Sequence, residues 1–231
     1  MTKPKTSRAA GRSTTRSFSK QAPDVRRQQL IDATFRCICH YGTEETSVRL
    51  IAQEAGLSLG MVRHHFRSKD ELLAATLRYL SSKVQDQITL AMAQSHPSPT
   101  ERLYAFIMAC LHPEALDADY VRARFLFWGL AHTNPTVRRV HDEIYGRFER
   151  QVRDLIAAIS KDSGAHLDLD VVTLTILALL KGIWVEWSLS PNRADPLKLA
   201  EQILPALDRT FADKLRRKIG RLERTTVARP R

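Results

Sequence analysis

Apolar residues recur along this chain at intervals of three and four positions, and no segment shows sustained alternation of apolar and polar residues. Such spacing places apolar side chains on one face of a helix, whereas a half-buried strand would alternate. The first stripe lies between Pro23 and Gly42 and consists of Leu30, Ala33, Cys37 and Tyr41. The pattern predicts an all-α fold of about nine helices with short connections.

Later helices are delimited by capping residues, prolines and glycine. A helix is predicted from Lys69 toward Gln94, and another begins at the capping box formed by Ser98 and Glu101. Three further helix starts are marked by Asn134-Pro135, Asp168 and Asp195-Pro196. The helix that starts at Asn134-Pro135 ends at Gly164.

The most informative segment covers residues 46–73. Val48, Ile51, Ala52 and Ala55 follow helical spacing, after which Gly56 supplies the left-handed backbone of a tight turn and Ser58 caps a second helix. Val62 and Phe66 face back toward a core, which leaves the Arg63 side free. This segment is a predicted helix-turn-helix, whose second helix can enter a DNA major groove.

These residues resemble the amino-terminal domain of the tetracycline-repressor family of bacterial regulators. The resemblance is close over residues 25–73, where it rests on Ile51-Ala52, Ala55-Gly56-Leu57-Ser58, Phe66 and Lys69, and it extends loosely to residue 213. It implies a three-helix DNA-binding domain followed by a helical ligand-binding and dimerisation domain. We therefore expect a disordered basic arm at 1–22, these domains at 23–70 and 71–213, and a disordered basic tail at 214–231.

The same resemblance implies which residues contact an operator in double-stranded DNA. Arg49 and Arg63 carry the planar fork that reads guanine, while His64, His65 and Lys69 are better placed for phosphates. Thr46 and Ser47 are expected to add hydroxyls and backbone amides. A lone surface arginine usually does nothing specific, so the assignment depends on the motif. The expected DNA-binding residues are Ser47, Arg49, Ser58, Leu59, Gly60, Arg63, His64, His65 and Lys69.

The second domain resembles the choline-responsive branch of this family in residues 122–131 and 177–184. The resemblance implies a small-molecule inducer, and the predicted inducer is a quaternary ammonium such as choline, which aromatic faces bind well. Core packing of the same aromatics is the alternative. The expected ligand-binding residues are Phe125, Trp128, Trp184 and Trp187, with Asp142, Glu143 and Glu186 as candidates to balance the charge.

Two apolar stripes occur in the predicted last two helices. They consist of Ile176, Leu180, Ile183 and Trp187, and of Ala200, Ile203, Leu204, Leu207 and Phe211. The family resemblance implies that such helices form a four-helix interface in a homodimer, although a monomer could bury them internally. Two copies would read two DNA half-sites.

Net charge is +11, and it lies in the ends of the chain: residues 1–20 carry +6 and residues 214–231 carry +7, which leaves −2 for the rest. Both ends have the composition of disordered segments, which is compatible with their binding DNA phosphates. No secretory signal or membrane-spanning run is recognised, so we expect a cytoplasmic protein.

The chain carries no pattern typical of an enzyme, a metal site or a cofactor site. Cys37, Cys39 and Cys110 are unpatterned and expected to be buried thiols, and neighbouring His64 and His65 diverge on a helix. Phosphate loops, nucleophile elbows and zinc spacings are absent. The predicted function is a homodimeric repressor of glycine-betaine synthesis that is released from its operator by choline. The alternatives are a regulator of unrelated genes with another hydrophobic or aromatic ligand, and a non-specific architectural DNA-binder.

Overall fold

The computed structural model describes residues 23–190 except 165, together with 195, 196 and 198. All secondary-structure elements in this part of the chain are helices, which confirms the all-α prediction. Eight helices lie within it, and the last predicted helix, which starts at Asp195-Pro196, lies almost entirely outside the described residues. The helices are α1 (Pro23–Glu45), α2 (Val48–Glu54), α3 (Leu59–His65), α4 (Lys69–Gln94), α5 (Pro99–Cys110), α6 (Ala118–Ala131), α7 (Pro135–Ser163) and α8 (Leu169–Leu189).

Local capping explains most helix starts. The side chains of Ser58, Ser68 and Ser98 each accept a hydrogen bond from a backbone amide three residues later, and Asn134 and Asp168 act in the same way. These bonds satisfy amides that have no partner within the helix. Every helix start predicted between residues 58 and 168 is thereby confirmed.

Two details differ from the sequence-based expectation. Tyr41 is 44% exposed, so the buried stripe of α1 ends with the preceding turn. The region after Pro99 is divided into α5 and α6, because Asp117 accepts bonds from the amides of Asp119 and Tyr120 and starts a separate helix. Asp117 is a standard capping residue, and the sequence interpretation did not use it.

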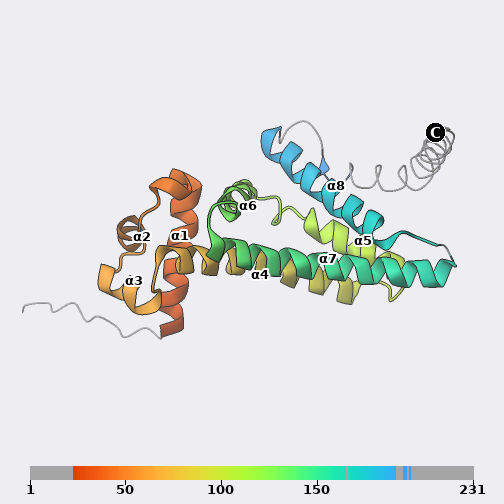
Figure 1. Ribbon diagram of the computed structural model, residues 1–231, viewed down its shortest axis with the longest axis horizontal. Coiled ribbons are helices and arrows are strands. Elements are labelled where there is room, and N and C mark those ends of the chain that lie inside the picture. Colours follow the sequence, from red (N-terminus) through yellow and green to blue (C-terminus); the bar gives the residue numbers. More distant parts are fainter. Residues whose placement is uncertain (1–22, 165, 191–194, 197, 199–231) are drawn as a thin grey trace, which may run out of the picture.

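The helices form an elongated molecule in which α4 and α7 run side by side along its length (Figure 1). Helices α1, α2 and α3 lie at one end, while α5 and α8 lie over the other part of α4 and α7 (Figure 1). None of the helices in the described part is long and apolar enough to cross a membrane.

Helix α4 contributes to each of three hydrophobic clusters. Leu72 packs with α1, α2 and α3; Leu77 packs with α1, α6 and α7; Ile88 packs with α5, α7 and α8. One continuous helix therefore connects the end that carries α2 and α3 with the part of the molecule under α8.

Candidate functional site

Helices α2 and α3 and their connecting turn have the predicted helix-turn-helix geometry. Ser47 accepts a hydrogen bond from the Leu50 amide at 3.1 Å and starts α2. Gly56 has φ +64°, a conformation that costs a residue with a Cβ atom about 1–2 kcal/mol. Ser58 then accepts from the Met61 amide at 3.2 Å and starts α3.

Packing fixes which face of α3 points outward. Val62 and Phe66 are buried against Leu30 of α1 and Leu72 of α4, together with Ile51 of α2. Because these side chains hold the inner face, the opposite face of α3 is free for contact with another molecule.

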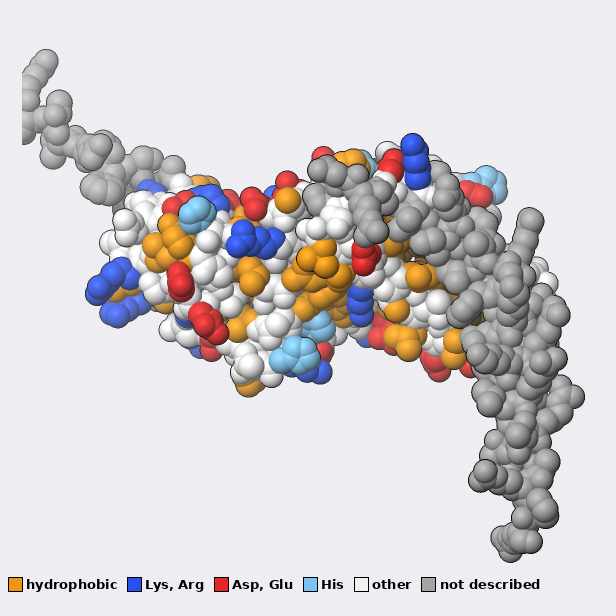
Figure 2. Space-filling view, turned by 90° about the horizontal axis from the view of Figure 1, so that it is seen from above, with side chains coloured by type: hydrophobic (Ala, Val, Ile, Leu, Met, Phe, Trp, Pro, Cys, Tyr) orange, Lys and Arg blue, Asp and Glu red, His pale blue; other side chains and the backbone are white. Residues whose placement is uncertain are grey.

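Most of the predicted DNA-binding residues lie at the surface of this end of the molecule, where Figure 2 also shows projecting Lys and Arg side chains. Leu59, His65 and Lys69 are half-buried. The exposed residues are Ser47, Arg49, Ser58, Gly60, Arg63 and His64.

Lys69 and Thr46 both bond to the end of α1. Lys69 donates from Nζ to the carbonyl oxygen of Thr43 at 2.8 Å. The hydroxyl of Thr46 is buried and donates to the carbonyl of Gly42 at 2.5 Å, so the expectation is wrong for this hydroxyl, which is not exposed to a DNA strand. Both side chains satisfy carbonyls that the helix end leaves without partners.

Two features of this surface depend on the fold around α3. Burial, with help from His64 and Arg27, lowers the pKa of His65 below its usual value, so its imidazole is neutral at pH 7. The guanidinium carbon of Arg27 lies 5.0 Å from the centre of the Phe66 ring. Sequence reasoning missed Arg27, since α1 was considered only for its apolar stripe.

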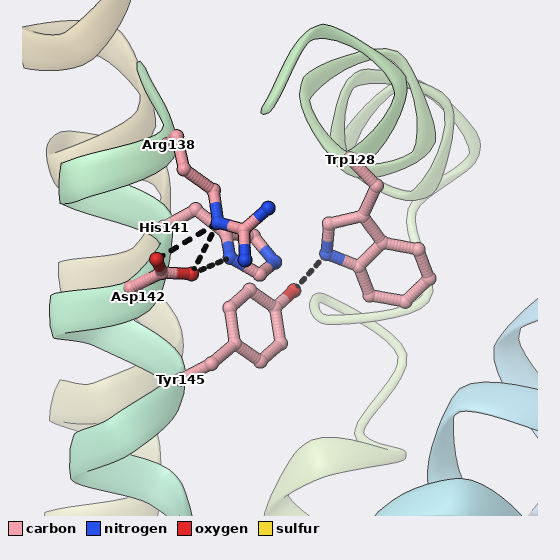
Figure 3. A network of polar contacts seen from close by, with 5 residues as sticks. All are labelled: Trp128, Arg138, His141, Asp142 and Tyr145. Carbon is pink, nitrogen blue, oxygen red and sulfur yellow. Dashed lines mark hydrogen bonds and ion pairs between the residues drawn. The ribbon is translucent and has the colours of Figure 1, made fainter. Parts of the chain in front are cut away.

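The predicted ligand-binding aromatics partly converge in the second half of the molecule. The Trp128 ring centre lies 5.2 Å from that of Phe125 and 6.3 Å from that of Trp184. Trp128 also donates from Nε1 to the hydroxyl of Tyr145 (Figure 3). Trp187 lies apart from this group and donates from Nε1 to the carbonyl of Leu116 at 2.8 Å.

A small cavity of about 40 Å³ lies beside these aromatics. Of the predicted ligand-binding residues, Trp184 lines it, and Trp128 contacts its wall through Tyr145. Helices α4 to α8 all contribute to the lining, which consists of Ser81, Val84, Phe106, Cys110, Arg124, Tyr145, Phe148, Leu177, Leu180, Lys181 and Trp184.

None of the three carboxylates expected to balance a bound cation lines this cavity. Asp142 pairs with Arg138 and His141 on the surface of α7 (Figure 3), and Glu143 pairs with Arg78. Glu186 is exposed on α8. The expectation that they neutralise a ligand in the cavity is therefore wrong for the conformation described.

One apolar stripe of α8 has a different role from the expected one. Ile176, Leu180 and Ile183 are buried in the subunit's own core, so they cannot form an interface with a second copy. The outer side of α8 instead exposes Val171, Leu174, Val185 and Leu189. The stripe at residues 200–211 lies outside the described residues.

The three cysteines are buried and unpaired, as expected. Burial raises the pKa of Cys39 and of Cys110 to about 12, which makes both thiols poor nucleophiles. Among the described residues, no group of three or more His, Cys, Asp or Glu side chains is arranged to hold a metal ion.

Comparison with family models gives two matches. Residues 30–76 match the model described as bacterial regulatory proteins of the tetR family, and residues 99–212 match the model described as the C-terminal domain of BetI-type transcriptional repressors. The match at 30–76 includes the helix-turn-helix and the start of α4.

Similar proteins agree with both matches. The HTH-type transcriptional regulator BetI of Serratia proteamaculans is 30% identical over 166 residues, which cover 71% of this chain and 82% of that protein. A transcriptional regulator of Pseudomonas aeruginosa PAO1 has 30% identity and a TM-score of 0.77, covering 83% of this chain and 94% of that one.

A transcriptional regulator of Saccharomonospora viridis, solved in complex with choline, has the same fold. Its TM-score is 0.69 at 19% identity, and the match covers 81% of this chain and 97% of that one. The helix-turn-helix geometry, the two family matches and the relatives at 30% identity lead to one conclusion. The chain belongs to the TetR family of bacterial transcriptional regulators, a non-enzymatic family of DNA-binding proteins, and has a BetI-type C-terminal domain.

Proposed function

We propose that the protein is a cytoplasmic homodimeric repressor that leaves its operator when a small molecule enters the cavity between α4 and α8. The observation that carries this proposal is the course of α4. It starts beside the helix-turn-helix at Lys69 and lines the cavity with Ser81 and Val84. A ligand that moves α4 would therefore also move α3, provided that it prefers the moved conformation.

In this proposal α3 lies in the major groove. Arg63 is exposed on α3 and can present both guanidinium nitrogens to a guanine, and Arg49 at the start of α2 can do the same. The amide at the start of each short helix and the hydrogen-bonded ammonium of Lys69 suit phosphates. The proposed contact set is Ser47, Arg49, Ser58, Leu59, Gly60, Arg63, His64, His65 and Lys69.

The exposed apolar side of α8 supports the homodimer. Its large members are Val171, Leu174, Val185 and Leu189, and they follow helical spacing. Exposed Ala178 and Gly182 lie between them and allow a partner helix to approach closely. Figure 2, which looks down on the α8 side, shows apolar side chains gathered midway along this face. A two-fold contact here, extended by the helix predicted after Pro196, would orient two α3 helices toward two half-sites.

Similarity to known regulators and the lining of the cavity point to different ligands. Similarity to BetI regulators and to the choline-bound fold supports choline and, with it, control of glycine-betaine synthesis. Arg124 and Lys181, which line the cavity, instead favour a different ligand and other target genes. The DNA-binding part of the proposal holds in either case.

Footprinting of the full chain on DNA upstream of its own gene and of neighbouring genes tests the proposal. We expect one protected palindromic site, loss of protection with Arg63→Ala, and release upon addition of the inducer. Uniform coating of every duplex without a protected site would overturn it in favour of the architectural alternative.

A further inference from the structure

The cavity is lined by an arginine for which the described residues offer no carboxylate partner. Arg124 of α6 lines it, and its buried Nη1 has no hydrogen-bond partner. Within the described residues, no carboxylate forms an ion pair with this guanidinium. Burying an unpaired charge costs free energy, so this guanidinium would gain more than any other group in the cavity from binding an anion.

A second cation faces the same space. Lys181 of α8 lines the cavity, and its Nζ lies 5.5 Å from the centre of the Tyr145 ring. No ion pair of Lys181 with a carboxylate is found among the described residues either. The remaining polar groups do not offset these charges, because burial keeps Cys110 and Tyr145 protonated by raising the pKa of each to about 12.

The aromatic face that a cationic ligand would need is already occupied. The guanidinium carbon of Arg124 lies 4.0 Å from the centre of the Trp184 ring, which is the position of a bound cation in a cation–π pair. A quaternary ammonium in this cavity would have to displace that guanidinium or lie beside two positive charges without a carboxylate.

We propose that the cavity binds an organic carboxylate, with the carboxylate on Arg124 and Lys181 and the apolar part of the ligand against Val84, Phe106, Phe148 and Leu177. This inference rests on the proposed function and names the class of its ligand. The fork of the Arg124 guanidinium can hold both carboxylate oxygens. The hydroxyl of Tyr145 accepts from Trp128 and keeps its own proton for donation.

The size of the cavity implies that binding moves helices. Its volume of about 40 Å³ suffices for roughly three water molecules, at about 10–15 Å³ for each. A carboxylate alone fits such a space, whereas its apolar part has to separate the lining helices, α4 among them.

Calorimetry and thermal denaturation of the full-length protein test the inference with pairs of compounds. Benzoate and octanoate are compared with benzamide and octanamide, which have the same shape without the charge. Glycine betaine is compared with choline, because both carry a trimethylammonium group and only betaine carries a carboxylate. We expect the carboxylate of at least one pair to bind and to raise the melting temperature, and its neutral or cationic counterpart to bind at least 10-fold more weakly.

Two variants locate the site. Arg124→Met keeps an apolar side chain of similar length and should weaken the binding carboxylate about 10- to 100-fold, which corresponds to the loss of a charge-assisted pair. Arg122→Met, two residues away on the exposed side of α6, should leave affinity unchanged. Ligand-free Arg124→Met should melt no lower than the wild type, because it removes an unpaired buried charge.

The inference is overturned if choline binds and no carboxylate does, if amides bind as well as carboxylates, or if both variants lose affinity equally. A melting temperature of ligand-free Arg124→Met far below that of wild type would also contradict it. Its failure is distinct from failure of the proposed function: a carboxylate that binds but leaves the operator footprint intact refutes ligand-induced release and keeps the assignment of the cavity.

Discussion

Individual side chains of the helix-turn-helix separate into those that hold the fold and those that remain free to read DNA. Lys69 and Thr46 bond to the end of α1, whereas the side chain of Arg63 is exposed on α3. Exposure on α3 makes Arg63 the residue whose loss should affect recognition without affecting folding.

Arg63→Ala should lower discrimination between operator and scrambled DNA by about 1–3 kcal/mol, because a bidentate contact to guanine is lost. Arg67→Ala is the matched control, since Arg67 is exposed just beyond α3. Titration of both variants with both duplexes measures the difference. Equal weakening on the two duplexes by Arg63→Ala would assign this residue to phosphates.

His65 should make operator binding depend on pH. Its lowered pKa leaves the imidazole neutral at pH 7, and a nearby phosphate would favour the protonated form. Binding would then take up a proton, so affinity should rise as pH falls from 7.5 through the pKa of the complex toward the lower pKa of the free protein. Fluorescence titrations across this range should show that the logarithm of affinity changes with pH in the wild type and in His64→Gln. In His65→Gln this dependence should be lost. A slope that persists in His65→Gln would show that another group takes up the proton.

Among the elements, the turn between α2 and α3 offers a comparison of two glycines. Gly56→Ala should destabilise the fold by about 1–2 kcal/mol, because φ is +64° there. Gly60→Ala lies within α3, where an added Cβ would meet only Ser58 Oγ at 3.8 Å, and should stabilise the helix by about 0.5–1 kcal/mol.

Chemical denaturation of the two variants measures this difference, and operator titration of Gly60→Ala adds a second result. Its new methyl group lies on the exposed surface of α3, so DNA affinity should fall while stability does not. If Gly56→Ala proves as stable as the wild type, the turn is not constrained as described.

Helix starts could be predicted from sequence because capping acts over three or four residues. Ser58, Ser68 and Asn134 each accept hydrogen bonds from amides two or three residues later in the chain. The inward-facing side of α8 could not be predicted in this way, since this helix carries apolar residues on more than one side. Ile176 and Leu174 are equally apolar, and only packing against α5 and α7 decides that the first is buried and the second is 67% exposed.

The same reason explains why the cavity was predicted only in part. Trp128 and Trp184 could be paired through the family resemblance, and they do lie close together. Arg122 and Arg124 look alike in sequence, but the contact of α6 with α8 turns only Arg124 toward Trp184. A charge inside the cavity is a consequence of that long-range packing.

At the scale of the whole molecule, two copies should associate through the exposed side of α8. Leu174→Glu combined with Leu189→Glu should yield monomers that fold normally, because both side chains are exposed within one subunit, at 67% and 75%. In a dimer the same substitutions would bury charges, and operator affinity should fall with the loss of two-site binding.

Analytical ultracentrifugation measures the mass, and circular dichroism checks that the variant is folded. Leu90→Glu is the control, because Leu90 is 58% exposed on α4. A double variant that still sediments as a dimer would place the interface elsewhere.

The continuity of α4 also has a mechanical consequence. Its 26 residues correspond to a rod of about 39 Å, and Val84 in the cavity lies roughly 22 Å along it from Lys69. If α4 tilts as a rigid rod about its position at the cavity, a tilt of about 5° displaces its α3 end, roughly 22 Å away, by about 2 Å. Hydrogen bonds to base edges tolerate only a few tenths of an ångström, so a small angular change suffices to break them. The displacement of α3 that a given tilt produces would then depend on the length of α4.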